Sequence, residues 1–358
     1  MKETYLRLLI MILVVLSLLA ALWAGLLRIG WGWPALQPLL PSLHGPLMVS
    51  GFLGTLIGLE RAVALGPRKF YMGPLLSGVG GLWLIIGLPI IVGQALIVLG
   101  SVGLTAVSLH IIRQHKTNYT VVMGLGALCW LMGNGLWLAG WPIFHFVYWW
   151  AGFLILTIVG ERLELSRVQR LSPGSIRLFD AAVLIFLAGL LLSLIWLAIG
   201  NRLASLGVVA LAIWLLRYDI ARRTVRQSGL TRYIGANLLV GYGWLVVGGL
   251  AALSWGALSA GPYYDLWLHA IFLGFAFGMI FAHALIILPS VTGMQLPYRP
   301  IFYLPSVLLH VSLLLRVLGD VLGLGLRPWG GLLNAVAILL FFGLVIGSIV
   351  VRRLTADS

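Results

Sequence analysis

Twelve apolar runs dominate this sequence, and each is about as long as a helix that crosses a lipid bilayer, which needs about 20 mostly apolar residues. Only 9% of the 358 residues are charged, whereas a soluble domain carries about a quarter. The runs cover residues 6–29, 37–65, 71–91, 93–113, 119–140, 143–163, 178–199, 203–218, 233–258, 264–289, 301–324 and 329–351. This pattern excludes a soluble enzyme and predicts an all-α polytopic membrane protein with twelve transmembrane helices in a single transmembrane domain, residues 1–358. The first run is longer than the core of a secretion signal, so we expect a retained helix.

The positive charges fall mainly on one side of the predicted membrane. Nineteen of the 23 lysines and arginines lie in the two termini and in the loops on the same side as the termini. The other side carries only Arg28, Arg202, Arg316 and Arg327. Because cytoplasmic loops are enriched in positive charge, we expect both termini in the cytoplasm and the protein in the bacterial inner membrane. The formal net charge of +14 therefore indicates orientation and a lipid partner rather than nucleic acid.

Aromatic and small residues indicate how the predicted helices sit and pack. Tryptophans gather near the outer helix ends, as expected for an interfacial belt, and these are Trp31, Trp33, Trp141, Trp149, Trp150, Trp267 and Trp329. Glycine pairs spaced by four, such as Gly54/Gly58 and Gly274/Gly278, allow helices to approach closely in lipid. The single cysteine, Cys129, permits no intrachain disulfide, and we interpret it as a small apolar filler.

An internal repeat relates the second and sixth predicted helices. His44, Gly51, Phe52, Glu60 and Arg61 recur 101 residues later as His145, Gly152, Phe153, Glu161 and Arg162. The tenth helix begins similarly, with His269 before a run rich in glycine and phenylalanine. We therefore predict three four-helix units, about residues 1–113, 119–218 and 231–353, around a pseudo-threefold axis. The three equivalent helices would each carry one histidine in the outer half.

These histidines are candidate metal ligands. An ionisable group inside a membrane helix is costly and is usually placed for a purpose. Neutral imidazole is the usual nitrogen ligand of haem iron and of copper, and bundles build such sites from facing helices. His44 and His269 share one predicted depth, which a bis-histidine haem requires. They are equally open to interpretation as interfacial histidines bonded to loop carbonyls.

The tenth helix carries a family resemblance. The stretch LHAIFLGFAFGMIFAHALIILPSVTG, with His269, Pro289 and Gly293, resembles the tenth helix of the haem–copper oxidase catalytic subunit. In that family the matching histidine is an axial ligand of the low-spin haem, and its partner comes from the outer part of helix two. His44, in HGPLMVSGFLGTLIGLE, occupies that place. The resemblance implies haem b, twelve helices, inside termini and pseudo-threefold symmetry.

A second resemblance points to a narrower family. HAIFLGFAFGMIFAHA, followed by LLHVSLLLRVLGD, resembles the carboxy-terminal portion of the NnrS-like family. Its members are twelve-helix membrane proteins linked to nitric oxide stress and reported to bind haem and copper. The resemblance implies a haem-binding and copper-binding membrane protein that acts in electron transfer or nitric oxide handling, with a quinol or a cytochrome as electron donor.

The sequence also departs from the oxidase pattern. Oxidases carry a second histidine two residues before the low-spin ligand, and this chain has Trp267 there. Their copper histidines come from helices six and seven; here helix six offers His145, followed by Tyr148, and helix seven has no histidine. We therefore expect no complete oxygen-reducing centre, and whether the protein is an enzyme stays open.

Further ionisable residues lie on the last helices. His283 and His310 would reach similar depths on helices ten and eleven, either as a second haem or copper site or as a buried hydrogen-bonded pair. Arg316 and Asp320, spaced by four, form either an intrahelical ion pair or, through Arg316, a contact with a haem propionate. Arg162, next to Glu161, is expected to form an interfacial ion pair at a helix end.

Two further classes of function remain open. A transporter also uses internal repeats and buried charges, but it often has inverted repeats, whereas this repeat keeps one orientation. A non-catalytic assembly subunit would need none of the histidine chemistry.

Overall fold

The computed structural model describes residues 3–294 and 296–356, and every regular element within those residues is a helix. Eleven helices of the described chain are long and apolar enough to cross a membrane. The prediction of a polytopic helical membrane protein is therefore confirmed. The predicted run 71–91 is the exception in length, because its α-helix α4 (Met72–Ile85) has only 14 residues.

By its internal contacts the chain divides into two compact units. Unit 1 comprises Met1–Phe153 with Ser290–Thr292, and unit 2 comprises Leu154–Pro289 with Gly293–Ser358. The helices of unit 1 are α1 (Glu3–Arg28), η1 (Leu40–Leu43), α2 (His44–Pro46), η2 (Leu47–Gly54), α3 (Thr55–Leu65), η3 (Arg68–Tyr71), α4, α5 (Ile90–Gln114), α6 (Asn118–Leu138) and the first part of α7 (Ile143–Leu165).

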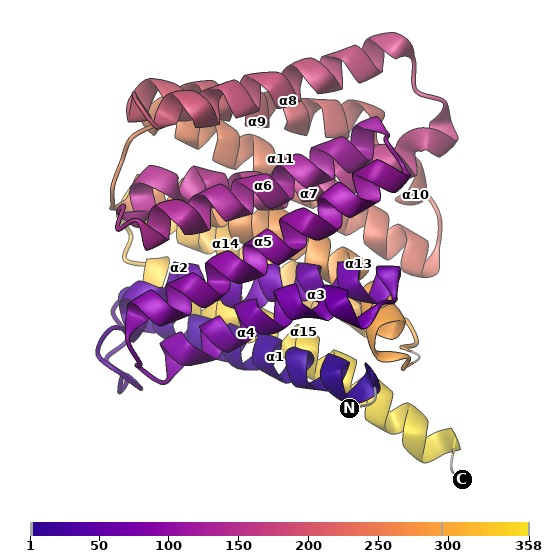
Figure 1. The fold of residues 1–358 in the computed structure, drawn as a ribbon, viewed down its shortest axis with the longest axis horizontal. Helices are drawn as coiled ribbons and strands as arrows, with labels where there is room; N and C mark the ends of the chain where they lie inside the picture. Colours follow the sequence, from indigo (N-terminus) through magenta and orange to yellow (C-terminus); the bar gives the residue numbers. More distant parts are fainter. Residues whose placement is uncertain (1–2, 295, 357–358) are drawn as a thin grey trace. The chain divides into compact units, whose positions relative to one another are not determined.

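Within unit 1, α1 packs against η2 and α4, α4 packs against α5, and α5 packs against α6 (Figure 1). Glycine makes the α4–α5 contact close, because a Cβ on Gly103 would lie 2.7 Å from the Cα of Gly73. The chain turns between these helices at Gly87, whose φ is 76°, and not near Gly93 as the apolar runs predict. Gly93 instead lies inside α5, where a Cβ would meet Leu84 at 2.7 Å.

Unit 2 contains the remaining helices, which pack largely in chain order. They are η4 (Ser166–Gln169), α8 (Pro173–Ser193), α9 (Leu197–Tyr218), α10 (Ala221–Thr224), α11 (Gly229–Trp255), α12 (Pro262–His269), η5 (Ala270–Phe277), α13 (Gly278–Thr292), η6 (Pro300–Phe302), α14 (Tyr303–Leu322) and α15 (Arg327–Ala356). α8 packs against α9, α9 against α11, α11 against α12 and η5, and α14 against α15 (Figure 1). α12 also contacts α14.

The spans that contain His44 and His269 share a local irregularity. Each includes an eight-residue π-helical segment, η2 after His44 and η5 after His269. π-Helical segments are rare and often occur at functional sites. The related span α7 is α-helical throughout. Among the three repeat-related spans, these two therefore resemble each other more closely than either resembles α7.

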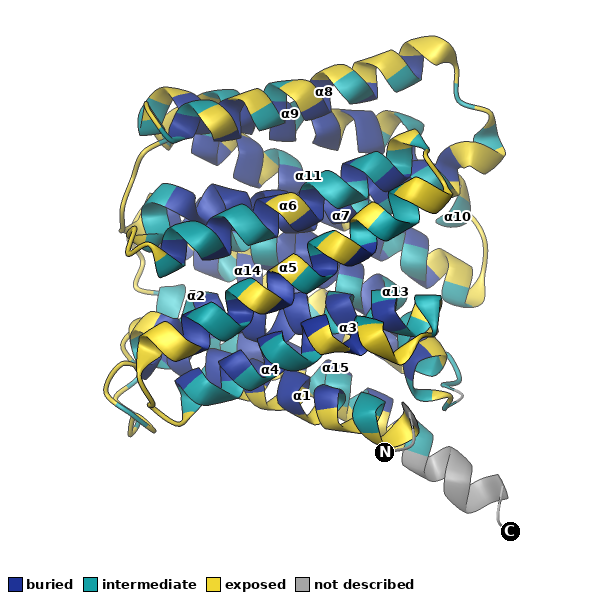
Figure 2. Ribbon diagram, viewed as in Figure 1, coloured by how far each residue is buried: buried dark blue, intermediate teal, exposed yellow. Residues whose placement is uncertain are grey.

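The burial pattern fits helices with one side towards lipid, as the alternating buried and exposed positions along α8 illustrate (Figure 2). Cys129 is buried, as expected of an apolar filler. The tryptophans of the predicted belt differ in how far they are buried inside the protein. Trp141 and Trp329 are exposed, but Trp149, Trp150 and Trp267 are buried. Burial of Trp150 is explained by its indole, which donates a hydrogen bond to Asn134 Oδ1 at 2.9 Å.

Candidate functional site

A buried group of charged side chains lies at one end of unit 2, around His269. Asp265 and His269 are one turn apart on α12, and Arg316 reaches them from α14. Arg316 donates from Nε and Nη2 to the two carboxylate oxygens of Asp265, at 2.6 and 2.7 Å. This is the bidentate geometry that makes arginine–carboxylate pairs strong.

A second arginine extends this group. Arg327, the first residue of α15, places Nη2 3.4 Å from Asp265 Oδ1 and Nε 3.5 Å from Asp320 Oδ1. We call the five side chains of Asp265, His269, Arg316, Asp320 and Arg327 the Asp265 cluster. The interpretation of Arg316 and Asp320 as an intrahelical ion pair is thereby corrected. Their spacing brings them near each other, but the fork of Arg316 matches the carboxylate of another helix.

His269 is oriented by its own helix. Its Nδ1 donates to the main-chain oxygen of Asp265 at 2.8 Å and lies 3.4 Å from the Asp265 carboxylate. A carbonyl oxygen can only accept, so Nδ1 carries the hydrogen and Nε2 of the neutral ring carries the lone pair. Histidines that bind metals usually donate their other ring N–H in this way.

His44 is held in the same protonation pattern in unit 1. Its Nδ1 donates to the main-chain oxygen of Ala21, on α1, at 2.7 Å. The ring packs against Gly25, where a Cβ would lie 2.8 Å from both Nδ1 and Cε1. α1 therefore fixes this imidazole by a hydrogen bond and by contact. In both histidines the accepting carbonyl belongs to a helix and not to a loop.

His145 is placed differently from its two repeat partners. Its ring stacks edge-on against Phe144 and Trp141, with centroids 4.2 and 5.8 Å away. Its imidazole forms no hydrogen bond with another described residue. The repeat therefore preserves a histidine at the start of the span but not its support.

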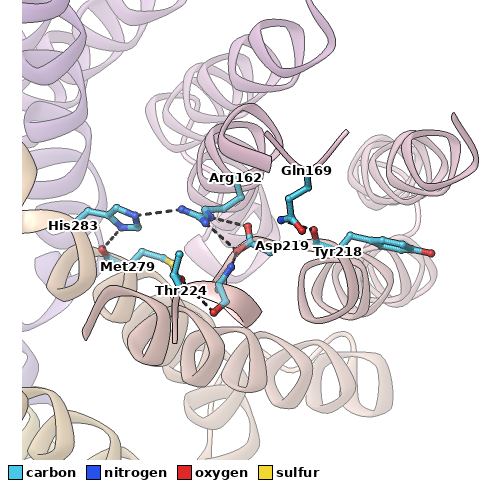
Figure 3. A network of polar contacts seen from close by, with 8 residues as sticks. Arg162, Gln169, Tyr218, Asp219, Thr224, Met279 and His283 are labelled. Carbon is cyan, nitrogen blue, oxygen red and sulfur yellow. Dashed lines mark hydrogen bonds and ion pairs between the residues drawn. The ribbon is translucent and has the colours of Figure 1, made fainter. Parts of the chain in front are cut away.

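A second polar site lies in unit 2 (Figure 3). It is at the helix ends that the predicted topology places on the cytoplasmic side. Arg162 donates from Nε and Nη2 to the two carboxylate oxygens of Asp219, each at 2.9 Å. The side chains are only 4% and 0% exposed. Asp219 also accepts from the main-chain nitrogen of Ala221 at 2.6 Å. Arg162 thus forms an ion pair at a helix end, as expected, and its partner is a buried acid in the turn that follows α9.

His283 belongs to this second site. Its Nδ1 donates to Met279 O at 2.9 Å, and its Nε2 accepts from Arg162 Nη1 at 3.5 Å (Figure 3). The lone pair that would bind a metal therefore faces a guanidinium. His310, on α14, lies with Cε1 3.5 Å from where a Cβ on Gly278 of α13 would be, and both its ring nitrogens are buried without a hydrogen-bond partner in the described chain. The alternative of a hydrogen-bonded His283–His310 pair is wrong.

Two buried acids of these sites escaped the sequence analysis. Asp265 lies one turn before His269, and that spacing was its available signal. Asp219 is the only acid in the basic segment 217–232, which is a signal for a specific ion pair. Within residues 3–294 and 296–356, no group of three or more His, Cys, Asp or Glu side chains has the arrangement of a metal site.

The fold and these buried polar sites define a multi-pass helical membrane protein with ionisable groups inside its spans. The chain belongs to the family described as "Domain of unknown function (DUF8744)", which matches residues 7–350. No curated protein and no solved structure matches it.

Proposed function

We propose that this protein is a haem b-binding protein of the bacterial inner membrane, with His44 and His269 as axial ligands. The observation that carries the proposal is that the two imidazole rings have the same hydrogen-bonding pattern. Each donates Nδ1–H to a helix carbonyl, which assigns the lone pair to Nε2. The oxidase-like resemblance of these two spans and the NnrS-like resemblance of the carboxy-terminal portion support it.

The Asp265 cluster supplies groups suited to haem propionates. Asp265 occupies Nε and Nη2 of Arg316, and Nη1 of Arg316 forms no hydrogen bond with a described residue. Arginine is well suited to carboxylates. We therefore propose Arg316 as a propionate-binding residue and add Arg327, which the sequence did not suggest.

When bound, the haem would supply a one-electron couple. His44 and His269 would be the residues that hold the haem, and a haem held by two histidines would favour electron transfer. The chain's own residues orient the ligands: α1 holds His44, and Asp265 holds both His269 and Arg316. We propose electron transfer or nitric oxide handling, with a quinol or cytochrome donor and without a complete oxygen-reducing centre. Copper binding is a separate proposal for His145, His283 and His310, of which His283 would first have to lose its contact with Arg162.

The proposal includes twelve spans and cytoplasmic termini. η3 and α4 form one continuous helical stretch, residues 68–85. At about 2.0 Å per 3₁₀ residue and about 1.5 Å per α residue, it is about 29 Å long. That length nearly matches a hydrocarbon core of about 30 Å. A spanning α4 keeps most positive charges on one side, as the positive-inside rule requires.

The visible spectrum of the purified protein tests the proposal. Wild-type protein should show a sharp reduced α-band, which His44→Ala and His269→Ala should each abolish. His115→Ala is the matched control, because His115 lies in the loop between α5 and α6 and should leave the band unchanged. Equal elution of all variants in size-exclusion chromatography shows that folding is retained. An unchanged band in both ligand variants would overturn the assignment.

A transporter is the second candidate function, and the Asp265 cluster is the observation that favours it. Buried ionisable groups within spans often mark substrate or proton pathways. A purified wild-type protein that takes up no haem when haem is supplied, and that acidifies proteoliposomes in a manner lost in Asp265→Asn, would favour this candidate over haem binding. An assembly subunit would show neither property.

A further inference from the structure

A groove runs along the surface of unit 1 between α4 and α5, and none of the candidate ligands discussed above lines it. Its volume is about 490 Å³, which is within the range of about 300–1,000 Å³ typical of ligand pockets. Gly73 and Gly103 form part of its wall, and the missing side chains let the two helices meet closely there. The groove therefore results directly from the glycine-mediated crossing of α4 and α5.

One end of the groove is basic. Lys69, in η3, and His110 and Arg113, near the end of α5, line it. Lys69 and Arg113 are exposed, and neither forms an ion pair with a described residue. The Lys69 ammonium lies 5.1 Å from the ring centroid of Phe70, and the His110 ring contacts the same phenylalanine at 5.4 Å. The positive charges of Lys69 and Arg113 are therefore not neutralised at this end of the groove.

The rest of the groove is apolar and faces outwards. Leu76, Val107 and the exposed side chains Met72, Leu99 and Val102 line it. In a membrane-spanning helix pair such exposed apolar residues face acyl chains. The basic end belongs to the side that the positive-inside rule assigns to the cytoplasm. A ligand that satisfies both ends must carry a negative headgroup and a hydrocarbon chain.

We propose that this groove binds an anionic phospholipid. Its phosphate would lie against Lys69 and Arg113, and an acyl chain would follow Leu76, Leu99 and Val102 along the helices. Basic pockets between transmembrane helices on the cytoplasmic side bind anionic lipid headgroups by this combination of charge and apolar contact. The inference does not depend on haem, because none of the groove residues belongs to the proposed haem site.

Native mass spectrometry of the full-length protein with added phosphatidylglycerol or phosphatidylcholine tests this proposal. We expect preferential retention of phosphatidylglycerol, and about a 30-fold loss of its affinity in the double variant Lys69→Ala/Arg113→Ala. The matched control is Arg223→Ala/Arg226→Ala, which removes two exposed positive charges of another segment and should leave the affinity unchanged.

Two further arms separate the sources of the binding energy. Val102→Trp, which fills the apolar part and keeps both cations, should also weaken phosphatidylglycerol binding. Inorganic phosphate should not displace the lipid, because it lacks the acyl chain. Equal retention of the two lipids, an equal loss in the control variant, or full affinity in Lys69→Ala/Arg113→Ala would overturn the proposal.

Discussion

The buried pair of Arg162 and Asp219 should contribute strongly to stability, and replacing Asp219 by asparagine tests this. The substitution keeps the shape of the side chain but removes its charge, so it leaves the guanidinium uncompensated. Arg162 donates two hydrogen bonds to this carboxylate. Asparagine keeps one acceptor oxygen, so one bond is lost outright, at about 1.5–3 kcal/mol, and the other becomes a weaker bond to a neutral group. Together with the loss of the charge, removing one partner of a buried ion pair costs about 3–5 kcal/mol.

The assay is reversible unfolding of the detergent-solubilised protein by a denaturing detergent, read by circular dichroism. We expect Asp219→Asn to lower the free energy of unfolding by about 4 kcal/mol. The double variant Arg162→Leu/Asp219→Leu should lose less, because apolar residues can replace a buried pair at little cost. Arg167→Ala is the surface control. Arg167 forms an ion pair with Glu164, and the two side chains are 61% and 38% exposed, respectively. This pair should contribute at most about 1 kcal/mol to the free energy of unfolding.

Two results would refute this reasoning. A loss below about 1 kcal/mol for Asp219→Asn would show that the pair behaves as a surface ion pair. The double variant could also lose as much free energy of unfolding as the single variants Arg162→Leu and Asp219→Leu lose in sum. That result would show that the two charges act independently.

Two further predictions concern unit 1. Gly25→Ala should weaken and shift the reduced α-band, because the added methyl would lie 2.8 Å from the His44 ring. Gly32→Ala is the control and should leave the band unchanged, because the space around Gly32 is open. Equal spectra of the two variants would contradict the role of α1 in holding His44. Asn134→Leu should lower the free energy of unfolding by about 1–3 kcal/mol, because the Trp150 indole loses its acceptor inside the protein. A stability unchanged in the same unfolding assay would contradict this.

The positions of the spans could be predicted because hydropathy decides them. Each predicted run coincides with a helix, and even the short run 203–218 lies within the 22-residue α9. The break after α4 was misplaced because Gly93 is a packing glycine, whereas the turn depends on the positive φ of Gly87. Hydropathy does not distinguish these two uses of glycine.

The partners of the candidate residues could not be predicted, because they come from distant parts of the chain. Spacing along α14 suggested that Arg316 pairs with Asp320, yet its two donors meet Asp265. Arg162 likewise pairs with Asp219 across 57 residues of chain. Local periodicity determines which residues share a helix face. Which residues of another segment lie against that face is determined only by tertiary packing.

The π-helical segments were also beyond the sequence analysis. Neither η2 nor η5 contains a proline, and the glycines that both contain also occur in the regular α-helices of this chain. In η2 the Ser50 carbonyl accepts a hydrogen bond from the Ser77 hydroxyl at 2.9 Å. Such support from a neighbouring helix is a tertiary effect, which explains why the composition of the segment alone did not reveal it.

Quantification of haem in the purified protein tests the central claim most directly. After expression with a haem precursor, the pyridine haemochrome of wild-type protein should give at least one haem b per chain, and His269→Ala protein of equal purity and elution volume should give none. Wild-type protein that contains no haem b under these conditions, or a His269→Ala variant with an undiminished content, would contradict the account.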